Sequence, residues 1–231
     1  MIDLTRDGPV FVLRMRSGEN RFNQPFVDAL NGGLDEVERA GTPAALVTIG
    51  EDKFYSNGLD LTWLTGAGSA DGPGFVGRFV AFLGRLLALP VPTVAAINGH
   101  AFAGGGMLAM AHDFRVMRAD RGFFCLPEVD IGLPFTPGMA AVIQAKLAPA
   151  VCTDLMLTGR RVGGTEAAAL GVVDETAGAE DLLARAVARA HALAGKAGAT
   201  YGAIKRVMYA PALQLTFEGA APSAPGRGGG G

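Results

Sequence analysis

Two carboxylates in an apolar segment are candidates for acid–base chemistry. Glu128 and Asp130 lie within residues 123–135, which are otherwise mostly aromatic, aliphatic, glycine or proline residues. A carboxylate held among such side chains loses solvation, so its pKa rises and it accepts protons better near neutral pH. If the segment is extended, both carboxylates face the same side. A loop carboxylate that caps a neighbouring helix is the alternative.

A glycine run could supply backbone hydrogen-bond donors. Gly104, Gly105 and Gly106 follow an apolar run and an Asn98-Gly99 turn, and they open a helical sequence. The first turn of a helix has unpaired N–H groups, and glycines there let a ligand approach the backbone. Such a site suits a developing oxyanion. Tight packing of the helix on a sheet is the alternative.

A second turn, at Ser56-Asn57-Gly58, could direct further N–H groups into a cleft. Alone, this sequence is typical of an ordinary turn. Phosphate-binding loops are not indicated, because no Gly-Lys-Ser/Thr sequence follows the glycines. The glycines near residue 70 follow no expected strand, so they make a poor dinucleotide-binding fingerprint.

The elements that must position these residues alternate between strands and helices. Apolar or β-prone runs predict strands at 10–16, 44–50, 93–97 and 114–117. Helical spacing and capping signals predict helices at 25–40, from Phe75 to before Pro90, from Gly104, 136–147, 150–158, 165–170, 181–195 and 200–209. Residues 66–74 are expected to be weakly ordered. The alternation predicts an α/β fold with a largely parallel sheet.

Composition excludes several classes of protein. Of 231 residues, 49% are hydrophobic and 18% charged, so the body of the chain is not disordered. The net charge is −2, without a Lys/Arg cluster, so no nucleic acid partner is expected. Two cysteines make no disulfide framework. Residues 86–111 lack acidic and basic side chains, but their prolines, Asn98 and glycines favour a buried strand, turn and helix over a membrane span.

The N-terminal sequence MIDLTRDG lacks the basic and apolar regions of a signal peptide, so a cytoplasmic location is expected. A peroxisomal location is the alternative, although the C-terminus is not of the Ser-Lys-Leu type. We expect a core over 1–195, a C-terminal helical segment over 196–218 and a disordered Gly-rich tail over 219–231.

Three motifs together resemble the crotonase (enoyl-CoA hydratase/isomerase) superfamily. They are F-x-S-x-G-x-D, A-x-x-N-G-x-A-x-x-G-G-G and P-E-x-x-I-G, and the resemblance runs from about residue 3 to 210. S-N-G-L-D-L, R-A-D-R-G and P-E-V-D-I-G-L are similar to the Δ3,Δ2-enoyl-CoA isomerase branch. The resemblance implies a crotonase-like ββα superhelix with a short C-terminal helical segment, a role in fatty acid β-oxidation, and a homotrimer or dimer of trimers.

The resemblance also implies roles for individual residues. The backbone N–H groups of Leu59 and Gly104 would form an oxyanion hole for an acyl-CoA thioester, and Glu128 would be the sole acid/base. Hydratases carry another glutamate where this chain has Met107, and the dienoyl-CoA isomerase branch carries an acidic group at the position of Thr136. These departures favour movement of the double bond of 3-enoyl-CoA to the 2-trans position.

Two other functions stay open beside the isomerase. One is a hydratase or another crotonase-type acyl-CoA enzyme, and the other is a non-catalytic acyl-CoA-binding homologue. The isomerase needs no cofactor and no metal, because CoA is part of the substrate. The role of Asp130 is open, and His100 and His112 lack metal-ligand spacing with other ligands.

The substrate-binding residues expected from the resemblance surround the three motifs. They are Arg21, Phe22, Ser56, Asn57, Gly58, Asp60, Phe102, Met107, Phe124, Leu126, Leu133 and Phe135. Lys53 and Lys205 are candidates for contacts with the CoA phosphates, with ordinary solvated surface as the alternative for each.

Overall fold

The computed structural model describes residues 1–218, and the tail expected over 219–231 lies outside the described residues. Six strands form the larger sheet, in the order β1-β2-β3-β5-β7-β9. Only β1 and β2 pair antiparallel, so the expected parallel α/β fold is confirmed. The strands are β1 (Ile2–Asp7), β2 (Val10–Met15), β3 (Ala45–Ile49), β5 (Thr93–Ile97), β7 (Phe114–Arg118) and β9 (Glu175–Ala177).

A second, smaller sheet carries the segments that lead into the functional motifs. Its parallel order is β4-β6-β8, with bounds Phe54–Ser56, His100–Phe102 and Phe124–Cys125. In the chain, each of these strands comes directly after, or nearly directly after, a strand of the larger sheet: β4 follows β3, β6 follows β5, and β8 follows β7. Each pair is followed by helix, which gives the repeated ββα turn of a crotonase-like superhelix. The repetition brings the three motifs to one side of the molecule.

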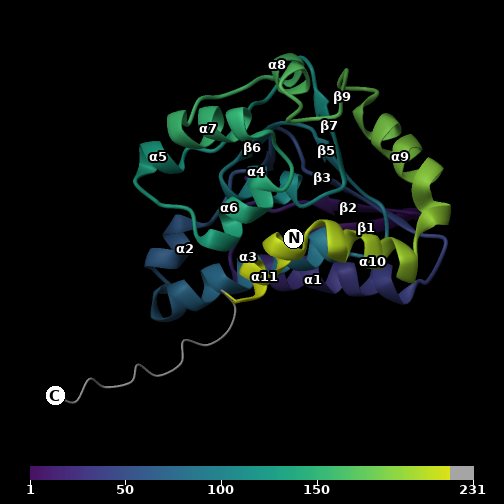
Figure 1. The fold of residues 1–231 in the computed structure, drawn as a ribbon, viewed down its shortest axis with the longest axis horizontal. Coiled ribbons are helices and arrows are strands. Elements are labelled where there is room, and N and C mark those ends of the chain that lie inside the picture. The colour runs from purple at the N-terminus through teal and green to yellow at the C-terminus, as the bar shows by residue number, and fades with distance from the viewer. Residues whose placement is uncertain (219–231) are drawn as a thin grey trace.

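Helices cover both faces of the larger sheet (Figure 1). The helices are α1 (Gln24–Arg39), α2 (Leu61–Thr65), α3 (Gly72–Ala88), α4 (Gly104–Met110), α5 (Glu128–Ile131), α6 (Pro137–Gln144), α7 (Pro149–Thr158), α8 (Gly164–Ala169), α9 (Leu182–Leu193), α10 (Ala199–Met208) and α11 (Ala210–Glu218). Short 3-10 turns occupy Ser69–Asp71 and Ala194–Lys196.

Side-chain alternation along the strands builds two apolar layers. Val47 of β3 and Val94 of β5 pack on one face of the sheet with Ala186 and Ala190 of α9. Leu46 belongs to the larger core on the opposite face, which includes the buried residues of α1, α3 and α4. Successive side chains of a strand point to opposite faces, so a strand covered on both faces reads as a continuous apolar run. This explains why β3 and β5 were predictable.

The C-terminal helices return to the core and close it beside α3 and α6. Close approach is possible because α3 and α6 carry glycines where α11 crosses them. A β-carbon on Gly84 would lie 2.3 Å from the Thr216 hydroxyl, and one on Gly138 would lie 2.9 Å from the Leu215 carbonyl oxygen. Within residues 1–218, no helix is long and apolar enough to span a membrane.

Several elements differ from the sequence predictions. Residues 66–74 are not simply weakly ordered, because a 3-10 turn and the start of α3 occupy their second half. The strand β1 and the short strands β4, β6, β8 and β9 were not predicted. They are two to six residues long, and short strands carry too few side chains for a clear alternating pattern.

Candidate active site

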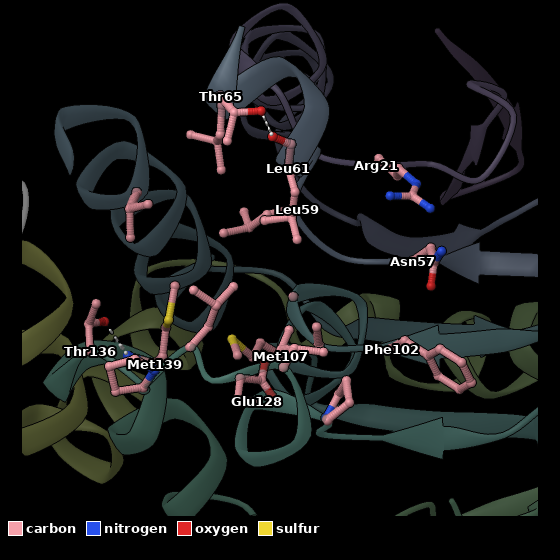
Figure 2. A pocket seen from close by; sticks show the side chains of 18 residues that line it. Arg21, Asn57, Leu59, Leu61, Thr65, Phe102, Met107, Glu128, Thr136 and Met139 are labelled. Atoms are coloured by element: carbon pink, nitrogen blue, oxygen red, sulfur yellow. Dashed lines mark hydrogen bonds between the residues drawn. The ribbon is translucent and has the colours of Figure 1, made fainter. Parts of the chain in front are cut away.

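A cavity of about 510 Å³ brings the three motifs together. Figure 2 shows Leu59 on one side of it, with Met107 and Glu128 close together on the other. Arg21, Asn57 and Phe102 lie toward one end, and Thr136 and Met139 lie toward the other. The cavity therefore has a polar end and an apolar end, with the carboxylate between them.

The segment after β4 is held so that the Leu59 N–H group is left without a partner. Phe22 N–H donates to the Gly58 carbonyl oxygen, and Asp60 N–H donates to the Phe22 carbonyl oxygen, both at 2.8 Å. These two hydrogen bonds form a parallel bridge that uses the Gly58 carbonyl oxygen and the Asp60 N–H, on either side of Leu59. Among the residues that the structure describes, nothing accepts a hydrogen bond from the Leu59 N–H. Leu59 itself lines the cavity.

The turn from β6 into α4 places the Gly104 N–H group beside the same cavity. Ala103 has φ 50° and ψ −122°, a strained conformation for a residue with a β-carbon. Its N–H donates to the Cys125 carbonyl oxygen at 3.0 Å, and its carbonyl oxygen accepts from Met107 N–H at 3.1 Å. Gly104 is the first residue of α4, so its N–H has no partner within the helix. A β-carbon there would lie 3.0 Å from the Phe79 ring and 3.4 Å from the Gly58 α-carbon.

Glu128 is the first residue of α5 and lines the cavity. Its side chain is buried, with the residue 7% exposed, and burial raises the pKa of its carboxyl from 4.5 to about 7. Its Oε2 atom has no hydrogen-bond partner within the described chain. A carboxyl with this pKa can both accept and return a proton near neutral pH.

Glu128 and Asp130 do not face the same side, because the extended segment on which that expectation depended is not formed. The segment is not extended but forms a short helix that ends at Gly132, which is left-handed with φ 66°. Residues two positions apart in a helix point about 200° apart. Asp130 is exposed and lies against Gly159 at the end of α7, outside the cavity lining.

The apolar lining explains the shifted carboxyl. Met107 is 2% exposed and stands in the cavity wall near Glu128 (Figure 2). Pro127, Ile131 and Leu133 line the same cavity. Within the described chain, Glu128 is the only carboxylate in that lining, so no other acid shares its proton.

The polar end of the cavity is organised by Glu19. Its carboxylate accepts hydrogen bonds from Asn57 Nδ2 at 2.7 Å and from Arg21 Nε at 2.8 Å. These two donors, Asn57 first, lower the pKa of Glu19. Across the end, the Arg161 guanidinium lies 5.3 Å from the centre of the Phe102 ring. Arg161 is not part of the lining, so this end of the cavity presents the Arg21 guanidinium, which is paired with Glu19, and the Asn57 amide.

Most of the predicted site lines the cavity. The residues that the structure places there are Arg21, Asn57, Leu59, Phe102, Gly104, Met107, Glu128 and Leu133. They come from chain segments more than 100 residues apart, which the parallel sheet order brings together.

Four predicted binding residues instead support the backbone behind the cavity. The Phe22 ring packs 4.7 Å from the Phe79 ring centre. Ser56 Oγ donates to the Asn20 carbonyl oxygen at 2.7 Å. Gly58 holds its backbone bridge, and Asp60 caps α2 by accepting from Trp63 N–H at 2.9 Å. None of the four lines the cavity, so their direct contacts with substrate stay predictions, while their side chains serve packing and capping.

Three predicted apolar wall residues also lie outside the lining. Phe124 and Leu126 are fully buried, and a β-carbon on Gly106 would lie 3.2 Å and 3.3 Å from their side chains. Phe135 is half-buried and packs on the core. Phe124 and Leu126 pack against α4 and do not reach the cavity. They therefore influence the cavity wall only through α4.

Ten residues that line the cavity, several of them at its apolar end, were not predicted as site residues. The missed lining residues are Leu61, Leu64, Thr65, Val76, Ala103, Pro127, Ile131, Pro134, Thr136 and Met139. Many are aliphatic members of ordinary amphipathic helices, so no sequence signal separates them from core residues. Thr136 gives a capping signal, and its hydroxyl accepts from Met139 N–H at 3.3 Å.

Lys205 is not a phosphate contact. It is 3% exposed, and its Nζ lies 2.9 Å from Asp113 Oδ1, so the expectation is wrong. Lys53 is exposed at a separate hollow that it shares with Arg121. His112 is buried between Thr48 and the Leu108 carbonyl oxygen. In residues 1–218, no cluster of three His, Cys, Asp or Glu side chains has the arrangement of a metal site.

Comparisons with known proteins show the family of this chain. The family model described as enoyl-CoA hydratase/isomerase matches residues 7–220. Enoyl-CoA delta isomerase 3 of Arabidopsis thaliana is 37% identical over 90% of this chain and 92% of its own. The peroxisomal enoyl-CoA delta isomerase 2 of the same plant is 36% identical over the same shares. A carnitinyl-CoA dehydratase of Salmonella enteritidis is 30% identical over 94% and 84%.

Solved structures are similar over nearly the whole chain. A probable enoyl-CoA hydratase from Mycobacterium tuberculosis has a TM-score of 0.88 at 27% identity, covering 95% of this chain and 92% of its own. A second structure of the same M. tuberculosis protein, named there as an enoyl-CoA isomerase, has a TM-score of 0.86 at 28% identity and covers 95% of both chains.

Proposed function

The chain belongs to the enoyl-CoA hydratase/isomerase family, and we propose that it is an isomerase that moves the double bond of 3-enoyl-CoA thioesters to the 2-trans position. One observation carries the proposal. Within the described residues, the cavity lining holds a single carboxylate, Glu128, and an apolar thioether, Met107, close beside it. One acid that both takes and returns a proton suffices for an isomerase.

The thioester oxygen would accept hydrogen bonds from the N–H groups of Leu59 and Gly104. Both groups border the cavity and neither has a partner in the described chain. As charge develops on this oxygen, two fixed donors stabilise it, and one such donor is worth about 10²–10³ in rate.

Glu128 would carry the proton between two carbons. Its carboxylate takes a proton from C2. The electron pair of the broken C–H bond forms a C1=C2 double bond while the carbonyl π electrons move onto the thioester oxygen, which gives a dienolate that still has its C3=C4 double bond. The neutral carboxyl then gives the proton to C4. The C3=C4 π pair forms the new C4–H bond, the oxygen lone pair re-forms the thioester carbonyl, and the C1=C2 pair becomes the C2=C3 double bond. No atom is gained or lost, so we propose no cofactor and no metal. The pKa of about 7 supports both half-steps.

The two ends of the cavity orient the substrate. We place the CoA part toward Arg21 and Asn57 and the acyl chain toward Thr136 and Met139. The apolar walls around Glu128 exclude water, which protects the dienolate from side reactions.

Hydration of 2-enoyl-CoA is the second candidate, because one relative is named a carnitinyl-CoA dehydratase. Water addition needs a group that holds and activates water, and Met107 has no such capacity. An acyl-CoA-binding protein without activity is the third.

A paired assay tests these functions. The purified protein is given 3-enoyl-CoA and, separately, 2-trans-enoyl-CoA, and products are identified by mass spectrometry and chromatography. We expect 2-trans-enoyl-CoA from the first and little 3-hydroxyacyl-CoA from the second. Hydration without migration of the double bond would overturn the isomerase. Binding without either reaction would favour the non-catalytic alternative.

The homotrimer or dimer of trimers stays a prediction, which light scattering of the purified protein tests. The cytoplasmic location also stays a prediction. One relative is named as peroxisomal, so microscopy of the tagged chain must distinguish the two compartments.

A further inference from the structure

The apolar end of the site is separated from a second cavity by one layer of side chains. The second cavity measures about 340 Å³ and lies between α3, α6 and α11. Val76 of α3 and Thr136, which caps α6, line both cavities. These two side chains are the wall that the cavities share.

The wall lies at the end opposite the polar groups. Figure 2 shows Thr136 far from Arg21, with Glu128 between them. In the proposed orientation, an acyl chain held at its thioester runs past Glu128 toward this wall. Its last carbons would meet Val76 and Thr136.

We propose that Val76 and Thr136 set the acyl-chain length that this protein accepts, and that its substrates are acyl-CoA thioesters whose chain ends at this wall. The inference rests on the proposed function, since it needs an acyl-CoA in the site. Val76 and Thr136 would then determine substrate specificity although they lie away from the reacting carbons.

The helices around the wall are held in place by packing and capping. The position of the wall therefore depends on the side chains of Val76 and Thr136. The Thr136 hydroxyl accepts from Met139 N–H at 3.3 Å, which holds its rotamer. On the far side, α11 is seated against α3 and α6, where a β-carbon on Gly138 would lie 2.5 Å from Val80. Val76 has no polar contact and is only half-buried. Truncating it joins the cavities without removing a cap.

A different route for the chain end is also present. Leu61, Ile131 and Leu133 line the site and are 41%, 49% and 42% exposed, so the cavity also opens between α2 and α5. A chain that left by this opening would not meet Val76. The experiment must therefore separate the two routes.

Calorimetric titration with saturated acyl-CoAs, from butanoyl-CoA to hexadecanoyl-CoA, makes the test independent of catalysis. Each buried methylene contributes about 0.8 kcal/mol, or about fourfold in affinity. We expect the affinity of the native protein to rise with length and then stop where the chain end reaches the wall. In Val76→Ala the rise should continue for at least one further carbon, so that the first chain beyond the native limit binds about fourfold tighter.

Val80→Ala is the matched control, because it makes the same truncation one helical turn later. Val80 lines only the second cavity. We expect its length limit to equal that of the native protein. Val76→Phe extends the wall and should move the limit to a shorter chain, which keeps the test decisive if Val76→Ala folds poorly.

The possible outcomes distinguish the wall, the opening between α2 and α5, and a failure of the proposed function. If Val76→Ala and Val76→Phe both kept the chain-length limit of the native protein, the proposed wall would be wrong. The chain end would then leave by the opening between α2 and α5. A shift in Val80→Ala equal to that in Val76→Ala would also overturn it. Failure of every acyl-CoA to bind the native protein would instead overturn the proposed function, and with it this inference.

Discussion

A β-carbon on Gly58 would lie 3.1 Å from the backbone nitrogen of Gly104 and 2.8 Å from the β-carbon of Ala103. Gly58 precedes Leu59, so this contact fixes the spacing between the two segments that carry the free N–H groups. Gly58 also has φ +80°, a conformation that favours glycine. A glycine here is thus required by both its neighbours and its backbone.

Gly58→Ala should separate the two N–H groups and lower kcat for 3-enoyl-CoA by about 10²-fold, the typical effect of losing one oxyanion donor. Steady-state kinetics measure this loss. Gly171→Ala is the control, since Gly171 has φ +72° with no atom within 4 Å of its β-carbon position. It should cost about 1 kcal/mol of stability and leave kcat unchanged. Equal kcat in the two variants would contradict the donor pair.

Glu128→Gln should lower kcat by about 10²–10⁴-fold, because an amide cannot accept the C2 proton. The shape is nearly conserved, so acyl-CoA should still bind, which calorimetry measures. Asp130→Asn makes the same chemical change on an exposed side chain of the same helix and should keep kcat within about twofold of the native value. A larger loss in Asp130→Asn than in Glu128→Gln would remove Glu128 from its proposed role.

The rate should depend on pH through Glu128. The base must be ionised, and burial raises its pKa from 4.5 to about 7. We therefore expect kcat/KM to increase about tenfold per pH unit below the pKa and to level off above it. A plateau that already begins near pH 4.5 would contradict the buried base.

Stability gives an independent measure of the same carboxyl. Its pKa is higher in the folded chain than in the unfolded chain, so the folded state binds the proton more tightly between about pH 4.5 and 7. The contribution of Glu128 to stability is present below this window and is lost as the pH rises through it, by up to about 3 kcal/mol. Urea unfolding should therefore show a larger decrease between these pH values in the native protein than in Glu128→Gln.

Lys205→Met should destabilise the protein by about 3 kcal/mol, because it leaves the Asp113 carboxylate buried without its cation. Adding Asp113→Asn should recover part of this loss. Lys53→Met changes an exposed lysine and should leave the unfolding midpoint nearly unchanged. If Lys205→Met weakened CoA binding without affecting unfolding, the structural role of the ion pair would be wrong.

The sequence was sufficient where a local rule determines the structure. Continuous apolar runs predicted β3 and β5, and the Thr136-Pro137 cap predicted the start of α6. The three motifs predicted that Leu59, Gly104 and Glu128 belong to one site. This prediction came from the resemblance that the motifs show in their order and spacing, because each motif alone was also compatible with an ordinary turn, a tightly packed helix or a capping carboxylate.

Only the tertiary structure decided which neighbours became walls of the site and which became support. Phe22 and Phe124 lie beside the motifs but are buried behind them, whereas Val76 and Met139 carry no motif and line the cavity. The tertiary structure also decided the role of Lys205, which is buried in an ion pair with Asp113. An apolar side chain has the same local signal in a core as in a cavity wall, and the difference depends on packing between segments distant in the chain.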